Sequence, residues 1–199
     1  RITPLTTRSV SQAGSMVGGR ALRGESRGEE GLLSTIYHDE DADLAALEGS
    51  TLAVIGYGNQ GRSQALNLRD SGLRVVVGNV ADASLARARE DGFEATSIPD
   101  ACARADAILL LVPDEVMPEV YERDVSPALR AGDLLDFASG YNIGFERIQP
   151  PADVDVILVA PRMIGPGVRD AYLEGRGLPS FVGVHQDATG RAQIGRAHV

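Results

Sequence analysis

A glycine-rich segment at residues 56–61 has the spacing that most clearly indicates a chemical function. It reads Gly-Tyr-Gly-Asn-Gln-Gly, which is the pattern Gly-x-Gly-x-x-Gly. In such a turn Gly56 allows a tight bend, and Gly58 has no Cβ to keep the backbone away from a pyrophosphate. Gly61 lets the following helix pack close to the strand, and free N–H groups at the helix start face the phosphate. The three glycines are therefore predicted to contact a dinucleotide.

The segments around this turn supply the context that a dinucleotide-binding fingerprint needs. An apolar run at 52–55 leads into the turn, and a second apolar run covers 73–77. Between them the apolar residues at 65–68 share one face of a helix, which a Ser-Gly pair at 71–72 ends. The order strand, turn, helix, strand favours a dinucleotide site. The alternative is a glycine-rich turn of an α/β domain that binds no ligand.

The loop after the second apolar run, Gly78–Ser84, is predicted to lie at the adenosine ribose, with Asn79 and Ser84 as candidate contacts. A site for a 2′-phosphate needs arginine, lysine or several hydroxyls, whereas a site for a free 2′-hydroxyl needs an acid. This loop offers one acid, Asp82, one hydroxyl, Ser84, and an arginine further along, Arg87. On these residues both NADP(H) and NAD(H) are candidate cofactors.

Pro113 and Asp114 follow a continuous apolar run, Asp106–Val112, of the kind that forms a buried parallel strand. Residues at the carboxyl end of such a strand lie at the ligand crevice, so both are candidate cofactor contacts. Asp114 is also placed to cap the helix that Val116 begins. The two roles can hold together.

Two further strand exits are predicted to line the floor of a substrate crevice. The strand Leu134–Ala138 leaves into Ser139, and the strand Asp153–Ala160 leaves into the glycine-rich stretch 161–167. Both exits are built from small residues that leave room for a ligand.

A last strand, Leu178–Val184, precedes His185 and Asp187. These two side chains suggest a catalytic pair, and the alternative is a loop histidine held by local hydrogen bonds. No His/Cys cluster has the spacing of a metal site, so no metal ligands are predicted in this chain.

Helices complete the pattern. One is expected over Ala83–Glu90, and a shorter one spans the acidic stretch 39–43 and ends at Gly49. The acidic side chains cap that helix, or alternatively bind a metal. Strands that alternate with helices predict an α/β fold: a doubly wound, mostly parallel sheet of the Rossmann type with helices on both faces.

Composition and charge narrow the classes of partner. The chain has 199 residues, of which 43% are hydrophobic, and a net charge of −9. That charge argues against nucleic acid or an anionic membrane as a partner. No apolar run approaches membrane-spanning length. The single cysteine, Cys102, allows no internal disulfide and indicates a reducing compartment, which predicts a cytoplasmic protein.

The two ends of the chain are expected to lie outside the folded domain, which is predicted to span 32–193. Residues 1–31 have a disordered composition and are predicted to be a non-native leader translated from upstream sequence. The alternative is an arginine-rich transit peptide, which would place the protein in a plastid or mitochondrion. Residues 194–199 are predicted to be a non-native tail read from a sequencing adapter, and the alternative is a native terminus.

Residues 37 to about 193 resemble the amino-terminal half of ketol-acid reductoisomerase, the acetohydroxy acid isomeroreductase of branched-chain amino-acid synthesis. The stretches that carry the resemblance are 37–44, 53–61 with 65–68, 113–121, 142–143, 154–161 and 174–190. The resemblance implies a Rossmann-type domain that binds NADPH. It also implies a magnesium-assisted alkyl shift in a 2-hydroxy-2-methyl-3-keto acid, followed by hydride transfer that gives a 2,3-dihydroxy acid.

The resemblance adds site residues to those given by position. It implies cofactor contacts at Tyr57, Asn59, Gln60, Asp114, Glu115, Val116, Met117 and Gly165. The magnesium carboxylates of the family lie in a helical domain beyond Gly190 that this chain lacks. The resemblance further implies a small keto acid substrate and a homo-oligomeric full-length protein.

The chain departs from the family at several positions. Ser139 stands where the family has its active-site histidine, and Arg162 stands where it has a lysine, so the resemblance makes both candidate catalytic residues. Met117 replaces a glutamine, and Val80 replaces an arginine in the adenosine loop. Because a serine hydroxyl does not titrate near neutral pH, Ser139 is not expected to transfer protons as an imidazole does at this position.

Two classes of function follow. One is an NAD(P)H-dependent oxidoreductase of the ketol-acid reductoisomerase type, or a divergent keto acid reductase that lacks isomerase activity. The other is a dinucleotide-binding module without catalysis. On either interpretation the chain alone is expected to be inactive, because it supplies no magnesium ligands and only half of a crevice.

Overall fold

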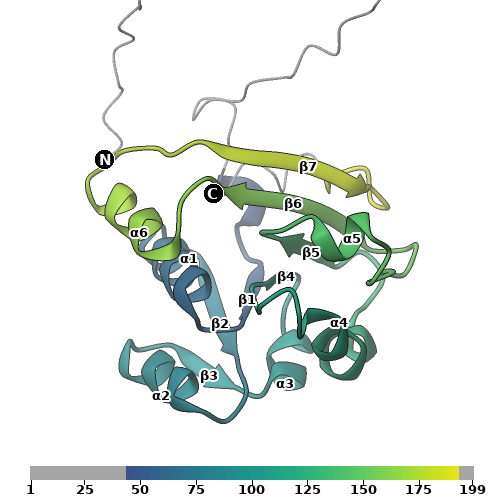
Figure 1. Cartoon of the computed structure of the whole chain (residues 1–199), viewed down its shortest axis with the longest axis horizontal. Helices are drawn as coiled ribbons and strands as arrows, with labels where there is room; N and C mark the ends of the chain where they lie inside the picture. Colours follow the sequence, from purple (N-terminus) through teal and green to yellow (C-terminus); the bar gives the residue numbers. More distant parts are fainter. Residues whose placement is uncertain (1–43, 193–199) are drawn as a thin grey trace, which may run out of the picture. The chain divides into compact units, whose positions relative to one another are not determined.

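The computed structural model describes residues 44–192, which contain one seven-stranded sheet (Figure 1). The strands are β1 (Thr51–Ile55), β2 (Arg74–Gly78), β3 (Glu94–Thr96), β4 (Ala107–Leu110), β5 (Leu134–Phe137), β6 (Asp155–Pro161) and β7 (Ser180–Gln186). The α-helices are α1 (Asn59–Asp70), α2 (Ala83–Glu90), α3 (Ile98–Cys102), α4 (Met117–Val120), α5 (Tyr141–Gly144) and α6 (Gly165–Leu173). Short 3₁₀ or π turns cover Leu44–Leu47, Tyr121–Val125 and Ser126–Ala128.

The strand order across the sheet is β3-β2-β1-β4-β5-β6-β7. Every neighbouring pair is parallel except β6 and β7, which are antiparallel. The chain winds outwards from β1 to β3 and then begins again with β4 on the other side of β1. The winding therefore reverses between β1 and β4, and in such sheets ligands bind outside the carboxyl ends of the strands at this point. The predicted fold class is confirmed.

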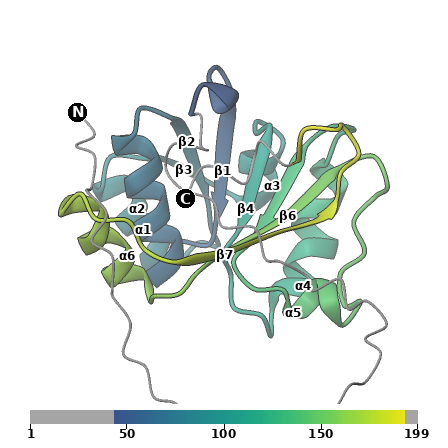
Figure 2. The ribbon, with the colours of Figure 1, turned by 90° about the horizontal axis from the view of Figure 1, so that it is seen from above.

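Helices cover both faces because successive residues of each buried strand point to opposite sides. In β1, Ala53 and Ile55 pack in one apolar cluster with residues of α3 and α4, whereas Leu52 and Val54 pack in another with residues of α1 and α2. Figure 2 shows α1, α2 and α6 on one side of the strands and α3, α4 and α5 on the other. A continuous apolar run such as β1 is what a strand covered on both faces requires.

The six predicted strands are all present, with bounds that differ by about two residues from those expected. Four elements were not predicted: β3, whose three residues Glu94–Thr96 carry no apolar run, the short helices α3 and α5, and α6, which begins at Gly165-Pro166-Gly167. The predictions for residues 1–31, for the acidic stretch 39–43 and for 194–199 concern residues outside the described part. The described end of the predicted acidic helix is a 3₁₀ turn over Leu44–Leu47.

An acid lies inside the sheet where an apolar residue is usual. Asp136 of β5 is 4% exposed, and its Oδ1 accepts a hydrogen bond of 3.1 Å from the Val159 N–H of β6. Burial raises the pKa of this carboxyl to about 7, because the charged form loses its hydration. The folded protein therefore holds a proton on Asp136 at a pH where the unfolded chain has released it.

Replacing this acid should change the pH dependence of stability. Below about pH 4 the carboxyl is protonated in both states, so Asp136→Asn should have a small effect. Between about pH 4 and pH 7 the unfolded wild type loses the proton first, which favours unfolding, and an asparagine has no such cost. We expect the stability gain of Asp136→Asn to grow over this range and then stay constant. Urea denaturation of both proteins from pH 4 to pH 8 measures it, and a pH-independent difference would contradict the assignment.

Candidate dinucleotide-binding site

The turn between β1 and α1 is shaped by two glycines that leave no room for a side chain. Gly56 has a φ of +93°, and a Cβ there would lie 2.9 Å from Val112 Cγ1 and 3.0 Å from the Leu111 carbonyl oxygen. A Cβ on Gly61 would overlap the carbonyl oxygen of Gly56. These close approaches hold the start of α1 against the end of β1 and beside the exit of β4.

Gly58 has the opposite surroundings. It is exposed, and apart from its two chain neighbours no described residue has an atom within 4 Å of a Cβ placed on it. Gly58 is the N-cap of α1, and no side chain caps the helix. The first N–H groups of α1 therefore have no partner within the helix, and their partial positive charge suits an anionic group. This arrangement fits a pyrophosphate at the place that the sequence predicts.

The start of α6 lies directly against the start of α1. A Cβ on Gly165 would overlap the carbonyl oxygen of Asn59, and the Gln60 side-chain amide donates to the Met163 carbonyl oxygen at 2.8 Å. Packing alone therefore requires a glycine at 165. Whether Asn59, Gln60 and Gly165 also contact a cofactor stays a prediction.

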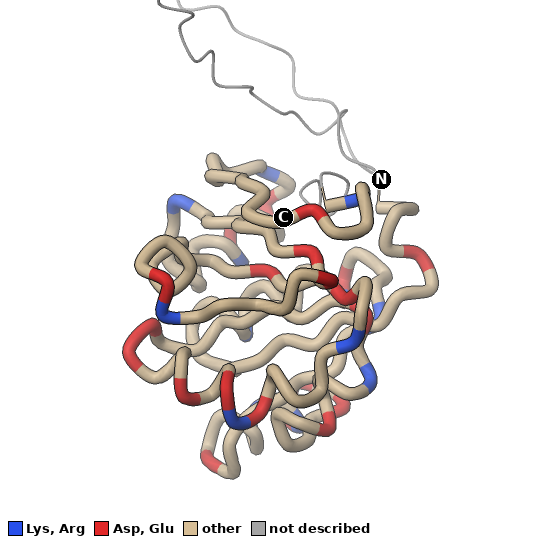
Figure 3. The backbone as a smooth tube through the Cα atoms, turned by 90° about the vertical axis from the view of Figure 1, so that its right-hand side faces the viewer, with Lys and Arg blue, Asp and Glu red and all other residues tan. Residues whose placement is uncertain are grey.

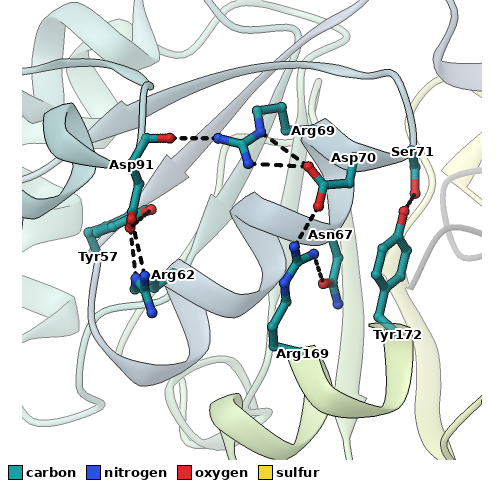
Figure 4. Close-up of polar contacts among 9 residues, drawn as sticks. All are labelled: Tyr57, Arg62, Asn67, Arg69, Asp70, Ser71, Asp91, Arg169 and Tyr172. Carbon is teal, nitrogen blue, oxygen red and sulfur yellow. Dashed lines mark hydrogen bonds and ion pairs between the residues drawn. The ribbon is translucent and has the colours of Figure 1, made fainter. Parts of the chain in front are cut away.

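Polar side chains fasten α6 along the side of α1 (Figure 4). The Arg169 guanidinium donates to Asn67 Oδ1 at 2.9 Å and pairs with Asp70 at 2.5 Å. The hydroxyls of Tyr172 and Ser71 lie 3.0 Å apart. The hydrogen bond from Arg169 lowers the pKa of the Asp70 carboxyl, so the pair stays charged at neutral pH. This polar seam sets how close the α6 start comes to the glycine-rich turn.

The side chain of Tyr57 does not face the crevice. It is 2% exposed, its ring packs edge-on against Phe93, and its hydroxyl donates to Asp91 Oδ2 at 2.9 Å. Arg62 pairs with the same carboxylate at 2.7 Å (Figure 4). Burial raises the pKa of Tyr57 well above its usual value. A cofactor contact at Tyr57 would therefore come from its backbone.

Asn79 connects the glycine-rich turn to the adenosine loop. Its buried Oδ1 accepts the Tyr57 N–H at 2.9 Å, and its Nδ2 donates to the Val80 carbonyl at 3.0 Å and to Asp82 Oδ1 at 2.9 Å. Asp82 Oδ1 also caps α2 by accepting the N–H groups of Ser84 and Leu85. The loop is thus fixed by its own polar groups, with the Asp82 carboxylate kept beside the expected ribose.

A cavity of about 300 Å³ opens next to this loop. Its walls come from the exits of β2 and β3 and from the turn after α4, and its lining residues are Asn79, Val80, Ala81, Leu85, Ser97, Ile98, Pro99 and Asp124. Its lining is mostly apolar, and Asn79 joins it to the glycine-rich turn, so it suits the adenine end of a dinucleotide.

The exit of β4 does not form the helix cap that the sequence suggested for Asp114. The N-cap of α4 is Val116, and no side chain caps that helix. Asp114 instead faces the exit of β5, where Ser139 Oγ donates to its Oδ2 at 2.9 Å and Asn142 Nδ2 donates to its carbonyl oxygen at 3.1 Å. Sequence reasoning gave Asn142 no role, although it lies three residues beyond Ser139 in the predicted crevice.

The other predicted contacts at this exit have mixed surroundings. Pro113 and Glu115 are exposed, and Val116 is 46% exposed. Met117 is 2% exposed, and its Sδ lies 3.3 Å from Asn142 Nδ2 inside the core. Contacts between these residues and a cofactor stay predictions.

The side chains of Arg162 and His185 are both associated with β7. The Arg162 guanidinium lies over the ring of Phe181 of β7, 4.8 Å from its centre. His185 belongs to β7 rather than to a loop, and its neighbour Gln186 pairs with Val156 at the amino end of β6. His185 therefore lies at the end of the sheet where the parallel strands begin, which is opposite to the crevice at their carboxyl ends.

Asp187 also has a structural partner, since its Oδ1 accepts the Ala192 N–H at 3.0 Å. Within residues 44–192 no group of three or more His, Cys, Asp or Glu side chains is arranged to hold a metal ion. No helix in this part of the chain is both long enough and apolar enough to cross a membrane.

A doubly wound sheet, a glycine turn at the exit of β1 and a cavity beside the exit of β2 together define a Rossmann-type dinucleotide-binding domain. The particular family follows from sequence comparison. Residues 46–197 match the family described as acetohydroxy acid isomeroreductase, NADPH-binding domain. The match covers more than half of the chain, and the chain belongs to this family.

Individual relatives agree. A ketol-acid reductoisomerase (NADP(+)) of Caldivirga maquilingensis is 49% identical over 160 residues, covering 80% of this chain and 49% of the relative. One of Pyrobaculum islandicum is 50% identical over 161 residues, with 80% and 49% covered. A solved NADH-preferring ketol-acid reductoisomerase from an uncultured archean has a TM-score of 0.81 at 46% identity, covering 83% of this chain and 52% of that one. The chain spans about half the length of the curated relatives it matches.

The contrast between two glycines gives a test of the site. Gly58→Val places a side chain in the open space over the α1 start, so we expect at least about tenfold weaker binding of NADH and NADPH with little change in melting temperature. Gly61→Ala forces α1 away from Gly56 and should lower the melting temperature first. Calorimetric titration and thermal unfolding measure both effects. A Gly58→Val protein that binds like wild type would exclude a pyrophosphate from this turn.

Proposed function

We propose that this chain supplies the cofactor-binding half of an NAD(P)H-dependent ketol-acid reductoisomerase. The reaction converts a 2-hydroxy-2-methyl-3-keto acid into a 2,3-dihydroxy acid by an alkyl shift followed by reduction. The observation that carries the proposal is the family match over residues 46–197 on a sheet with an intact glycine turn. The relatives that are 49% and 50% identical are named ketol-acid reductoisomerase (NADP(+)), which supports the same reaction.

Each part of the site has a task in this proposal. The bound nicotinamide supplies the hydride. The first turn of α1 binds the pyrophosphate, the cavity beside Asn79 takes the adenine, and the exit of β4 orients the nicotinamide end. Magnesium, which would assist the alkyl shift, needs carboxylate ligands from outside residues 44–192. We further propose a homo-oligomeric cytoplasmic enzyme with a small keto acid as its substrate.

The distribution of charge is consistent with a small-molecule substrate. In Figure 3 the acidic segments alternate with single arginines around the described loops and helices. The net charge of −9 disfavours nucleic acid and anionic membranes as partners.

A keto acid reductase without isomerase activity is the second candidate, and two observations favour it. The Ser139 hydroxyl donates a hydrogen bond to the Asp114 carboxylate, and the Arg162 guanidinium lies over the ring of Phe181. Both positions, which the sequence analysis named as candidate catalytic positions, thus have partners within the protein. The Ser139 hydroxyl is not free to donate to a substrate without a rearrangement, and the Arg162 guanidinium lies against β7.

A chimera tests the two candidates. This chain would replace the matching half of the Caldivirga maquilingensis relative, and NADPH consumption would be followed with acetolactate and with the already rearranged 3-hydroxy-2-keto acid. The reductoisomerase proposal expects consumption with both substrates, and the second candidate only with the rearranged one. The isolated chain should consume none, because residues 44–192 hold no cluster of magnesium ligands and form only one side of the crevice. A folded chimera that binds NADPH but uses neither substrate would contradict both.

We also expect Ser139→His in the chimera to raise acetolactate turnover relative to the rearranged acid. An imidazole titrates near neutral pH, and general acid–base assistance is worth about 10² to 10⁴-fold. The ratio of the two initial rates measures the effect. A high ratio already in the wild-type chimera would show that position 139 is no handicap.

Cofactor preference is expected to be weak. Asp82 keeps a negative charge beside the ribose, and Val80, 51% exposed, offers no cation. We expect a preference for NADPH over NADH below about tenfold, or roughly 1.4 kcal/mol. Val80→Arg should shift the ratio about tenfold towards NADPH by pairing with a 2′-phosphate. Titrations with both cofactors measure this, and a thousandfold wild-type preference for NADPH would overturn it.

A further inference from the structure

The exits of β4 and β5 are joined by hydrogen bonds that converge on one carboxylate. Ser139 Oγ donates to Asp114 Oδ2 at 2.9 Å, and Asn142 Nδ2 lies 3.3 Å from Asp114 Oδ1 and 3.1 Å from the Asp114 carbonyl oxygen. Asp114 itself is half-buried. Both carboxylate oxygens therefore have a donor that fixes their direction, and lone pairs remain for a ligand.

The Ser139 hydroxyl is fully used by these contacts. A serine hydroxyl can donate one hydrogen bond, and Ser139 donates it to the Asp114 carboxylate. Its oxygen also accepts a hydrogen bond of 3.3 Å from the N–H of Tyr141, the first residue of α5. In this arrangement Ser139 cannot donate to a substrate oxygen, so its contribution must pass through Asp114.

Asn142 has a single orientation. It is 0% exposed, and its Nδ2 donates to Asp114 and lies 3.3 Å from Met117 Sδ, while its Oδ1 has no hydrogen-bond partner among residues 44–192. Rotating the amide would place Oδ1 against the Asp114 oxygens, where two acceptors repel. A buried acceptor is left unpaired to keep this donor on Asp114, and such a cost is usual at functional sites.

The position of Asp114 identifies what its carboxylate can bind. Leu111 and Val112, just before it, touch Gly56 of the glycine-rich turn, whereas the adenine cavity lies beside Asn79 on the other side of that turn. A dinucleotide with its pyrophosphate at Gly58 would extend its second ribose towards Asp114. A carboxylate with free lone pairs is a suitable acceptor for the two hydroxyls of a ribose.

We propose that Ser139 is a positioning residue, which together with Asn142 holds the Asp114 carboxylate to accept the hydroxyls of the nicotinamide-side ribose. The proposal rests on the dinucleotide binding proposed above. It gives Ser139 a role in binding half of the cofactor, in place of the catalytic role that its place at the family's histidine position suggests.

Three ligands separate this role from general support of the fold. ADP lacks the second ribose, ADP-ribose has it without nicotinamide, and NADH has both. For Ser139→Ala we expect about five- to tenfold weaker binding of ADP-ribose and NADH, and ADP binding within about twofold of wild type. Ser139→Thr keeps the hydroxyl and should restore ADP-ribose binding. Calorimetric titration of the chain measures all three affinities.

Two further variants complete the experiment. Asp114→Asn removes the charge and should weaken ADP-ribose without affecting ADP, and it carries the test if Ser139→Ala does not fold. Glu122→Gln removes an exposed charge from the turn after α4 and should leave all three affinities unchanged.

The outcomes are distinct. Equal loss of ADP and ADP-ribose in Ser139→Ala, or no loss of either, overturns the positioning role while the dinucleotide site stands. If the folded wild-type chain binds none of the three ligands at millimolar concentration, the proposed function itself fails, and this inference fails with it.

Discussion

The start of α1 is held by contacts between backbones that leave no space for a side chain. Gly61 packs directly against the carbonyl oxygen of Gly56, and Gly165 packs directly against the carbonyl oxygen of Asn59. Because a Cβ at either glycine would separate these segments, the turn after β1, the start of α1 and the start of α6 form one unit. The crevice, the uncapped N–H groups and the neighbouring β4 exit take their positions from it.

Much of the fold could be predicted because buried parallel strands appear in the sequence as continuous apolar runs. The six longer strands were recognisable in this way, and their alternation with helices predicted a doubly wound, mostly parallel sheet, though not the order of its strands. The strand β3 and the helix α6 were not recognisable. Glu94–Thr96 pairs only because β2 offers an edge, and α6 begins with Gly-Pro-Gly, which as an isolated sequence resembles a loop. In both cases tertiary contacts decide the local structure.

The candidate site also has a part that could be predicted from the sequence and a part that could not. The glycine turn was predictable because its spacing and the flanking strand and helix are close together in the sequence, although the contacts that require Gly56 come from Leu111 and Val112 at the exit of β4. The partners of Asp114 were not, because they depend on the register that brings β4 beside β5, and the cap that local spacing suggested for Asp114 is absent. Local pattern likewise placed His185 near the chemistry, whereas the antiparallel direction of β7 carries it to the opposite end of the sheet.

The seam between α1 and α6 has a consequence for the order of folding during synthesis. Arg169 and Asn67, which it joins, lie 102 residues apart in the chain. A nascent chain that has emerged as far as β5 already carries the glycine turn and the Asp114 exit. The wall made by α6 can dock only after a further stretch of chain has left the ribosome, because domains fold as their segments emerge. During that interval the polar flank of α1 that carries Asn67 and Asp70 is exposed to water, and the Asp70 carboxylate lacks its Arg169 partner.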